Sequence, residues 1–487
     1  MSHAPVGDDR GIRLTPLVRT GRELTALAAP IAGVQFAQVA LTTTDLAVMG
    51  LIGVQAIAAG GLAAILYNLM RTMCVGVVTA VGNLVAGAAA QGEARSGSDG
   101  PDAQAQTEVR QITRSAFLVA TVAAVLLGAA LIALGYLLPI FGLDKDVLAG
   151  ARPMMITLAP GLVPMVWLNV LRQFSVGMRR PGPLLAVSIA SIAVNAALDF
   201  ALVYGVLGVP RLGLAGIGLA TTLVQTLSVA VFYFMLRRDS RLAPLLSIDA
   251  WNADGRIARN ILRLGVPISL TYGSEAGITS LAAVVMGAFG PTALAAHNVV
   301  TQLTRIAFQI SIGLSHGSSI LISRAIGKGD KGQAKQIAVA ALLLGAITTV
   351  ILGLLYLVAP TAVLRPFLDP TDSATIVVAK FFLLFAIIQQ IVDFTQNIAV
   401  GLLRGIGNTT AGLRATSAGY WLVGLPTMML LAFPAHLHGA GIWIGLSTGF
   451  AATAALLLRR FRKDLPQTAW PAPSPGSQPL EDYPLED

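Results

Sequence analysis

Charged residues are scarce in this sequence. Asp, Glu, Lys and Arg make up 12% of its 487 residues, whereas 55% are hydrophobic, and the mean hydropathy is +0.73. An ordinary soluble domain is roughly a quarter charged. A chain with so little charge is poorly suited to a surface that faces only water. The composition therefore excludes a typical soluble domain and predicts a membrane protein.

Cysteine and cofactor-binding motifs are also missing. The single Cys74 excludes a disulfide within the chain and a cysteine-rich metal centre. The five histidines form no H-E-x-x-H pattern; they are His3, His297, His316, His436 and His438. The segment 326–330 (IGKGD) lacks the glycine and Ser/Thr spacing of a P-loop, and 213–218 (GLAGIG) follows no strand. We therefore expect no catalytic residues, no cofactor, no ATP and no nucleic acid.

Long apolar segments recur instead along most of the chain. A membrane-spanning helix needs about 20 mostly apolar residues. Twelve segments meet this need, at about 24–50, 56–88, 114–141, 153–177, 184–206, 214–236, 261–289, 293–323, 336–360, 376–401, 412–433 and 440–458. The first segment lacks a clear cleavage site for a signal peptide, so we expect it to remain in the membrane. The sequence thus predicts an all-α polytopic membrane protein with twelve transmembrane helices.

The basic residues are distributed asymmetrically between the two sides of the membrane. With the N-terminus inside, external loops hold only five of the 33, which are Lys145, Arg152, Arg211, Arg365 and Lys380. Three others, Arg71, Arg172 and Arg305, lie within spans. Because cytoplasmic loops carry an excess of Lys and Arg, this distribution predicts that both termini are cytoplasmic. The net charge of +9 therefore reflects membrane orientation rather than nucleic-acid binding.

The chain contains an internal repeat. A shift of 237 positions places Pro30 on Pro267, Gly76 on Gly313, and 48–50 (VMG) on 285–287 (VMG). A repeat with six spans per half predicts two lobes related by an axis along the membrane normal, with substrate bound between them. The expected divisions are a cytoplasmic tail (1–23), an N-lobe (24–237), a cytoplasmic linker (238–260), a C-lobe (261–460) and a disordered cytoplasmic tail (461–487).

Four carboxylates are predicted inside the membrane. They are Asp45, Asp199, Glu275 and Asp393, in spans one, five, seven and ten. A charge at the centre of a span costs about 2.5–3.5 kcal/mol even on the lenient insertion scale, so these groups need a cavity, a partner or a cation. One interpretation is that they pair with the intramembrane arginines. The other interpretation is that they bind a transported cation. It is favoured because the four acids outnumber the three arginines.

Two further features suggest how such a site works. Asn195 lies four residues before Asp199, so one helix face presents an amide and a carboxylate together, which suits a proton or a hard monovalent cation. Pro30 and Pro267 occupy equivalent positions in the first span of each half. A proline removes a helix hydrogen bond, so each predicts either a point of helix bending or a static bend.

Four segments together resemble the multidrug and toxic compound extrusion (MATE) family, especially its NorM-like branch. They are 30–50 (PIAGVQFAQVALTTTDLAVMG), 195–205 (NAALDFALVYG), 265–287 (GVPISLTYGSEAGITSLAAVVMG) and 393–409 (DFTQNIAVGLLRGIGNT), within a resemblance that covers about 20–460. The resemblance implies a V-shaped pair of six-helix lobes with alternating access. It also implies export of cationic or amphipathic drugs in exchange for sodium ions or protons.

The resemblance assigns roles to particular residues. Asp45, Asn195, Asp199 and Thr221 match the cation-coupling residues of the family's N-lobe, and the first of these follows the bending proline by fifteen positions, here Pro30. Glu275 and Asp393 resemble the C-lobe acidic pair. Gln389 stands one turn before Asp393, where the branch often has a tyrosine. Sodium is expected either at Asp45, Asn195 and Asp199 or at Glu275 and Asp393, and the coupling lobe stays open.

The sequence thus predicts a secondary antiporter for multidrug efflux in a bacterial inner membrane. We expect a monomer that contacts membrane lipid and small organic cations or amphipathic drugs. A lipid-linked oligosaccharide flippase of related fold is the main alternative, because arginines inside the membrane could hold a pyrophosphate. A polytopic enzyme, a channel and a major-facilitator transporter fit less well. The sequence lacks the long catalytic loop that an enzyme needs and the ring of like residues typical of a channel. It also lacks the charged motif that follows span two in a major-facilitator transporter.

Overall fold

The structure is a computed structural model that describes residues 14–98, 100–141, 145–208, 210–368 and 372–470. Within these ranges every regular element is a helix. The α-helices are α1 (Leu14–Ile52), α2 (Val54–Thr79), α3 (Val81–Ser96), α4 (Ala103–Leu137), α5 (Lys145–Leu158), α6 (Leu162–Gly177), α7 (Gly182–Tyr204), α8 (Leu214–Arg238), α9 (Gly255–Gly287), α10 (Pro291–Gly327), α11 (Lys331–Val358), α12 (Pro360–Leu364), α13 (Ser373–Gly405), α14 (Thr409–Ser417), α15 (Leu425–Ala432) and α16 (His438–Asp464).

Most of these helices could cross a membrane. Eleven helical segments of the described chain are long and apolar enough, and three of them join two consecutive α-helices: α2 with α3, α5 with α6, and α14 with α15. The helix α9 is not among the eleven, although its 33 residues exceed the length that a span needs. Its middle turns carry polar residues such as Ser269, Ser274 and Glu275. With α9 counted, the arrangement has the twelve long helical segments that the sequence predicts.

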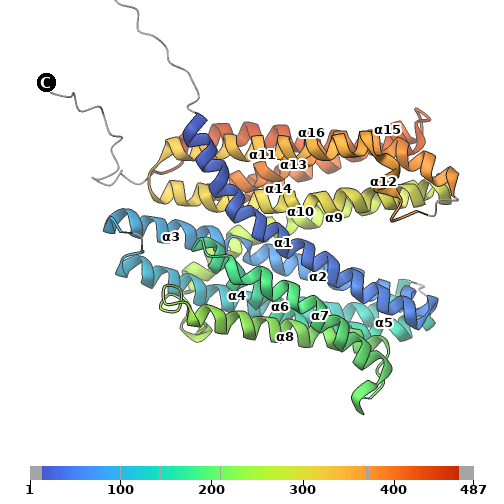
Figure 1. The fold of residues 1–487 in the computed structure, drawn as a ribbon, viewed down its shortest axis with the longest axis horizontal. Coiled ribbons are helices and arrows are strands. Elements are labelled where there is room, and N and C mark those ends of the chain that lie inside the picture. Colours follow the sequence, from blue (N-terminus) through green and yellow to red (C-terminus); the bar gives the residue numbers. More distant parts are fainter. Residues whose placement is uncertain (1–13, 99, 142–144, 209, 369–371, 471–487) are drawn as a thin grey trace, which may run out of the picture.

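The helices form two bundles, which Figure 1 shows one above the other. One buried apolar cluster belongs to the first half of the chain, and two further clusters belong mainly to the second half. The first helix of each half begins in the apolar core of the other half. Leu24 of α1 packs among second-half residues, and Ile261 of α9 packs among first-half residues. These two residues are 237 positions apart, so the internal repeat also governs how the lobes are joined.

Glycines allow the lobes to approach closely at two equivalent places. A Cβ atom on Gly76 of α2 would lie 2.6 Å from Cα of Ser269 on α9. A Cβ atom on Gly313 of α10 would lie 2.6 Å from the carbonyl oxygen of Ala28 and 3.0 Å from Cβ of Ala32, both on α1. Gly76 and Gly313 are repeat partners, as are Ala32 and Ser269. Small residues are typical of tight helix packing in membranes, where backbones must come close together.

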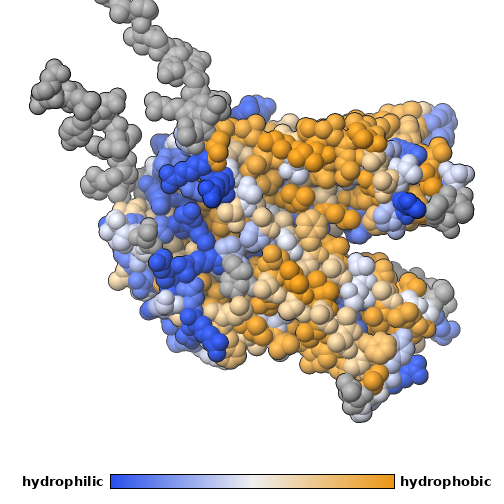
Figure 2. All heavy atoms as spheres, in the orientation of Figure 1, coloured by the Kyte–Doolittle hydropathy of each residue, from blue (hydrophilic) through white to orange (hydrophobic). Residues whose placement is uncertain are grey.

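The lobes are held together at one end of the molecule. Asn83 on α3 donates to the hydroxyl oxygens of Ser319 and Ser323 on α10, at 2.7 and 2.9 Å. Further toward this end, Glu93 on α3 forms ion pairs with Arg324 and Lys328. The helix α1 begins and α16 ends at this end, whereas Figure 2 shows a cleft between the lobes at the other end. The cleft therefore opens on the side away from the ends of the described chain.

Several boundaries differ from the sequence prediction: α1 begins at Leu14, within the predicted tail 1–23, and α16 continues to Asp464, past the predicted start of the disordered tail at 461. Span two was expected at 56–88, but helical structure continues through α3 to Ser96. Glu93 falls outside the predicted span, whereas it lies on a helix and contacts the other lobe. The sequence around it reads as a loop because Glu93, Arg95 and Ser96 are polar. That polarity instead serves the contact between lobes.

Candidate functional site

The first acidic cluster joins three helices of the first half. The amide nitrogen of Asn195 on α7 donates to Asp45 of α1 at 2.6 Å and to Asp199 of α7 at 2.7 Å. The two carboxyl groups also lie within hydrogen-bonding reach of each other. Asn195 and Asp199 are fully buried. The structure therefore brings together Asp45, Asn195 and Asp199 of the four residues assigned to this site, and we call them, with the fourth, Thr221 of α8, the N-site.

The N-site contains oxygen atoms without a partner. Asn195 Oδ1, Asp199 Oδ1 and Thr221 Oγ1 are buried and form no hydrogen bond of normal geometry with the described residues. The Thr221 hydroxyl lies beside Asp45. Two adjacent buried carboxylates cannot both stay ionised without a positive partner, because like charges repel strongly where water is excluded. A proton between them, or a cation bound by the free oxygens, would resolve this repulsion.

The second acidic cluster lies in the other lobe. Glu275 is on α9 and Asp393 on α13, and both are partly buried and close enough for their charges to interact. Asn397, one turn after Asp393, donates to its carboxylate at 3.0 Å. Gln389, one turn before Asp393, has a buried Oε1 atom without a partner among the described residues. We call Glu275, Asp393, Gln389 and Asn397 the C-site.

The intramembrane arginines do not neutralise these acids. Arg71 of α2 donates to Gln38 of α1 at 2.6 Å, and Arg172 of α6 donates to Gln35 of α1 at 3.2 Å. In the described ranges, the ion pairs involve only carboxylates outside the N-site and the C-site. The interpretation that each acid pairs with an arginine is therefore not supported by this structure.

The comparison with protein families decides the classification. The MatE family model matches the chain twice, at residues 30–201 and 267–430. This chain belongs to the MatE family. The two matches begin at Pro30 and Pro267, which are the repeat partners found in the sequence.

Curated relatives agree with this MatE assignment. The chain is 35% identical over 444 residues to the "Probable multidrug resistance protein NorM" of Pseudomonas aeruginosa, covering 90% of this chain and 88% of the relative. It is 33% identical to the protein of the same name from Bradyrhizobium diazoefficiens, covering 90% of this chain and 92% of the relative. The NorM-like resemblance is thereby confirmed, and so is the expectation of a transporter rather than an enzyme.

Solved structures have the same MatE fold. The eukaryotic MATE transporter AtDTX14 superposes with a TM-score of 0.79 at 19% identity, covering 93% of this chain and 98% of that one. The bent form of the Vibrio cholerae MATE transporter VcmN superposes with a TM-score of 0.78 at 16% identity, covering 93% of this chain and 99% of that one. At such identities the likeness establishes the fold alone, which confirms the predicted all-helical architecture.

Sequence reasoning missed two residues at the C-site of this MatE protein. Asn397 has the same four-residue spacing from an aspartate that drew attention to Asn195, so its signal was present. Tyr420 lies in a π-helix, η5 (Ala418–Gly424), between α14 and α15. Its buried hydroxyl has no partner of normal geometry among the described residues, and it lies near Glu275 and Asp393. Short π-helical turns frequently occur at functional sites.

A third residue, Arg404, falls beyond the predicted span 376–401 and lies instead in the last turn of α13. Its side chain is buried and donates to Ser319 Oγ of α10 at 3.0 Å and to Tyr272 of α9 at 3.4 Å. Tyr272 lies one turn before the part of α9 that holds Glu275. This arginine therefore stabilises the packing of the helices that carry the C-site.

Pro30 and Pro267 lie inside α1 and α9, and both helices continue without a break. Each proline leaves one carbonyl of its helix without an intrahelical donor, which weakens the helix there. In α1 the weak point lies about four turns from Asp45. The role of these prolines in helix bending remains a prediction.

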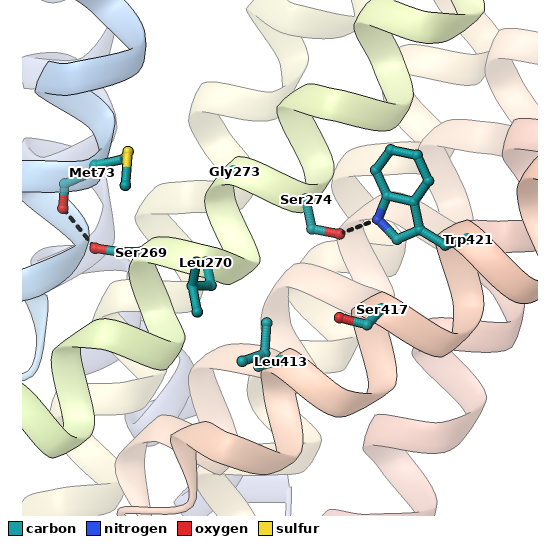
Figure 3. Close-up of a pocket in the computed structure, with 8 residues that line it drawn as sticks. All are labelled: Met73, Ser269, Leu270, Gly273, Ser274, Leu413, Ser417 and Trp421. Atoms are coloured by element: carbon teal, nitrogen blue, oxygen red, sulfur yellow. Dashed lines mark hydrogen bonds between the residues drawn. The ribbon is translucent and has the colours of Figure 1, made fainter. Parts of the chain in front are cut away.

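A cavity of about 450 Å³ lies at the junction of α2, α9, α14 and the π-helix (Figure 3). Met73, Leu270, Leu413 and Trp421 give it an apolar lining, and three serines add hydroxyl groups. The Trp421 indole donates to Ser274 at 2.8 Å, and the Ser269 hydroxyl donates to the Met73 carbonyl at 2.6 Å. A mainly apolar lining with few polar groups, at this volume, is typical of sites for small organic molecules.

Proposed function

We propose that this MatE protein exports cationic or amphipathic organic compounds from bacterial cells, in exchange for sodium ions or protons. The multidrug resistance proteins that it resembles at 35% and 33% identity support the substrate class. Family membership also favours this function over a lipid-linked oligosaccharide flippase. We propose that one chain acts alone, because the internal repeat supplies both lobes.

The observation that carries the proposal is the pair of acidic clusters without arginine partners. In each cluster, the described residues provide buried oxygen atoms that form no hydrogen bond. Oxygen atoms of carboxylates, amides and hydroxyls are suitable ligands for a sodium ion, and the carboxylates can also accept a proton. Acidic side chains inside a membrane bundle typically mark ion pathways.

The proposed cycle follows from this geometry. The apolar cavity and the cleft between the lobes hold the organic compound while the acids are free. A cation entering from the open side binds Asp45, Asn195, Asp199 and Thr221, and α1 bends at Pro30, which displaces the compound. The return step closes the cleft and separates the lobes at the end held by Glu93. Only a difference in ligand affinity between the two states can drive such an exchange.

The proposed orientation places both termini in the cytoplasm of a bacterial inner membrane. Figure 2 shows hydrophilic residues gathered at the end where α1 begins and α16 ends, and the sequence assigns most Lys and Arg residues to the loops of that side, as the positive-inside rule requires for the cytoplasmic side. In this orientation the cleft opens away from the cytoplasm, and the structure represents an outward-open state. A compound released from it would leave the cell.

Ethidium efflux from cells that lack their own drug pumps tests the proposal. Wild-type protein should export ethidium when an inward sodium or proton gradient is imposed, with the two gradients set separately. Asp45→Asn, Asp199→Asn, Glu275→Gln and Asp393→Asn should each lower this efflux, whereas Glu108→Gln, at an exposed position on α4, should not. If well-expressed wild type exports no ethidium under either gradient, the proposed function is wrong.

A further inference from the structure

A second, smaller cavity lies between α9 and α10. Its volume is about 280 Å³, and its lining includes Thr279, Ser280, His297, Asn298, Gln302 and Arg305. Hydroxyl, amide, imidazole and guanidinium groups thus surround it, in contrast to the apolar cavity of Figure 3. Each of these side chains can donate a hydrogen bond, and none of the lining residues is acidic. Such a lining is suited to an anionic group.

Arg305 supplies the positive charge of this cavity. It lies near the middle of α10, and its guanidinium forms neither an ion pair nor a hydrogen bond with the described residues. A charged side chain inside a membrane bundle normally faces a cavity and has a partner. Arg71 and Arg172 have such partners in glutamine side chains. Arg305 is therefore the arginine of these three that is available to a ligand.

His297 provides an independent indication of a ligand. Its side chain is 2% exposed, packs 5.3 Å from the Trp443 ring, and still lines the cavity. Its Nε2 atom is 3.5 Å from the Thr301 hydroxyl, whereas Nδ1 is buried and without a partner in the described part of the chain. A buried nitrogen without a partner destabilises the protein, because it has lost its hydrogen bonds to water and formed none in their place. An oxygen atom of a ligand in the cavity would satisfy it.

The C-site begins one turn away on the same helix. The Thr279 hydroxyl, which lines the cavity, donates to the backbone carbonyl of Glu275 at 3.0 Å. Residues four apart on a helix lie about 5–6 Å apart. The cavity therefore borders the turn of α9 that carries Glu275.

We propose that the α9–α10 cavity is a subsite for the carboxylate of zwitterionic amphipathic compounds. Arg305 binds the carboxylate oxygens, His297 and the neighbouring hydroxyl and amide groups complete their hydrogen bonds, and Glu275 receives the positive end. At about 280 Å³ the cavity is below the usual size for a whole drug molecule, so it holds the acidic group and its immediate surroundings. The inference rests on the proposed export of organic compounds and names the residues that hold an acidic group of such a compound.

A matched pair of fluorescent dyes tests this subsite. Tetramethylrhodamine carries a positive xanthene ring system and a free carboxylate, and its methyl ester lacks only the negative charge. Binding of each dye to purified protein is measured by fluorescence polarisation for wild type, Arg305→Gln and Arg305→Lys. Arg365→Gln, at an exposed position beyond α12, removes the same charge away from the cavity and is the control.

The expected result is a selective loss. Arg305→Gln should weaken binding of the free acid about tenfold or more, as expected for a lost hydrogen bond to a charged group, and change ester binding less than about twofold. Arg305→Lys should fall between, because an ammonium keeps the charge without the fork geometry. Retained ester binding verifies that each variant is folded.

Three results would overturn the subsite: no binding of the free acid by wild type, equal losses for both dyes in Arg305→Gln, or no loss for either. Gradient-driven export of the ester is measured in parallel with wild type. Absence of that export, with normal binding of both dyes, would count against the proposed function and not against the subsite.

Discussion

The two lobes contain acidic clusters with similar groups but different construction. At the N-site a single amide, that of Asn195, bridges both carboxylates, and Asp199 is fully buried. At the C-site, Asn397 contacts only Asp393, and both acids are partly exposed. One amide thus links both acids of the N-site into a unit that a single ion can occupy, whereas the amide of the C-site holds only one of its two acids.

The difference follows from how the repeat has diverged. The position of Asp45 in α1 corresponds to Ala282 in α9, and that of Glu275 corresponds to Gln38. Gln38 accepts a hydrogen bond from Arg71 at 2.6 Å. At equivalent positions of the repeat, the first half therefore has an amide bound to a guanidinium, whereas the second half has the acid Glu275. We infer that the N-site binds the coupling cation and that the C-site mainly attracts the positive end of the transported compound.

The largest expected effect comes from neutralising the N-site acids. Asp199→Asn and Asp45→Asn should each lower gradient-driven efflux at least about tenfold, because either change removes the repulsion that a cation relieves. Glu275→Gln and Asp393→Asn should instead raise the substrate concentration needed for half-maximal efflux and leave its dependence on the gradient intact. Efflux rates across a series of imposed gradients distinguish the two. Equal loss of gradient dependence in both lobes would remove the distinction between the sites.

The second prediction concerns the ion pair that closes the cytoplasmic end. Glu93→Gln leaves Arg324, which is 7% exposed, without its charged partner, at a cost of about 3 kcal/mol. This cost applies only while the lobes are in contact at that end, so the population should shift away from the outward-open state. Spin-label distances between α3 and α10 should lengthen. Glu108→Gln is the control, and unchanged distances would mean that the ion pair does not stabilise closure.

The bridging amides provide a finer comparison of the two sites. Asn195→Ala removes two hydrogen bonds to carboxylates, whereas Asn397→Ala removes one hydrogen bond to a carboxylate, that of Asp393. We expect Asn195→Ala to change the cation concentration for half-maximal dye displacement about tenfold, and Asn397→Ala about threefold or less. A larger effect of Asn397→Ala would indicate that coupling belongs to the C-site.

The smallest effect is expected at Asp102, outside the membrane. A hydrogen bond from Arg95, followed by one from the backbone of Ala105, lowers the pKa of Asp102 to about 2. Because the pKa is lowered by folding, the stabilisation is present above the unfolded value of about 4 and is lost as pH falls through about 2. Asp102→Asn should therefore leave the pH profile of efflux between about pH 6 and pH 8 unchanged. A shifted profile would mean that groups outside the membrane contribute to proton coupling.

Much of this architecture could be predicted from the sequence. Apolar length located the spans, and the shift of 237 positions located the repeat, because both depend on local pattern. The four intramembrane acids stand out since charge is rare in apolar segments. The residues missed have weaker signals. Arg404 resembles a residue of a cytoplasmic loop, and Tyr420 reaches the C-site through a π-helix, whose extra residue per turn changes which side chains share a face.

The partners of the acids could not be predicted, because helix periodicity does not fix which faces of different helices meet. Pairing with Arg71 and Arg172 was a reasonable alternative from composition. Only the packing reveals that these guanidiniums contact Gln38 and Gln35. For the same reason the contact of Glu93 with α10 could not be read from a segment that resembles a loop.

The most direct test of coupling at the N-site is displacement of a bound dye by the coupling cation. Ethidium binding to purified protein is measured while sodium concentration and pH are varied separately, for wild type and Asp199→Asn. One of the two cations should displace ethidium from wild type, and Asp199→Asn should bind ethidium without responding to that cation. Displacement that is equally strong in Asp199→Asn would contradict cation coupling at this site.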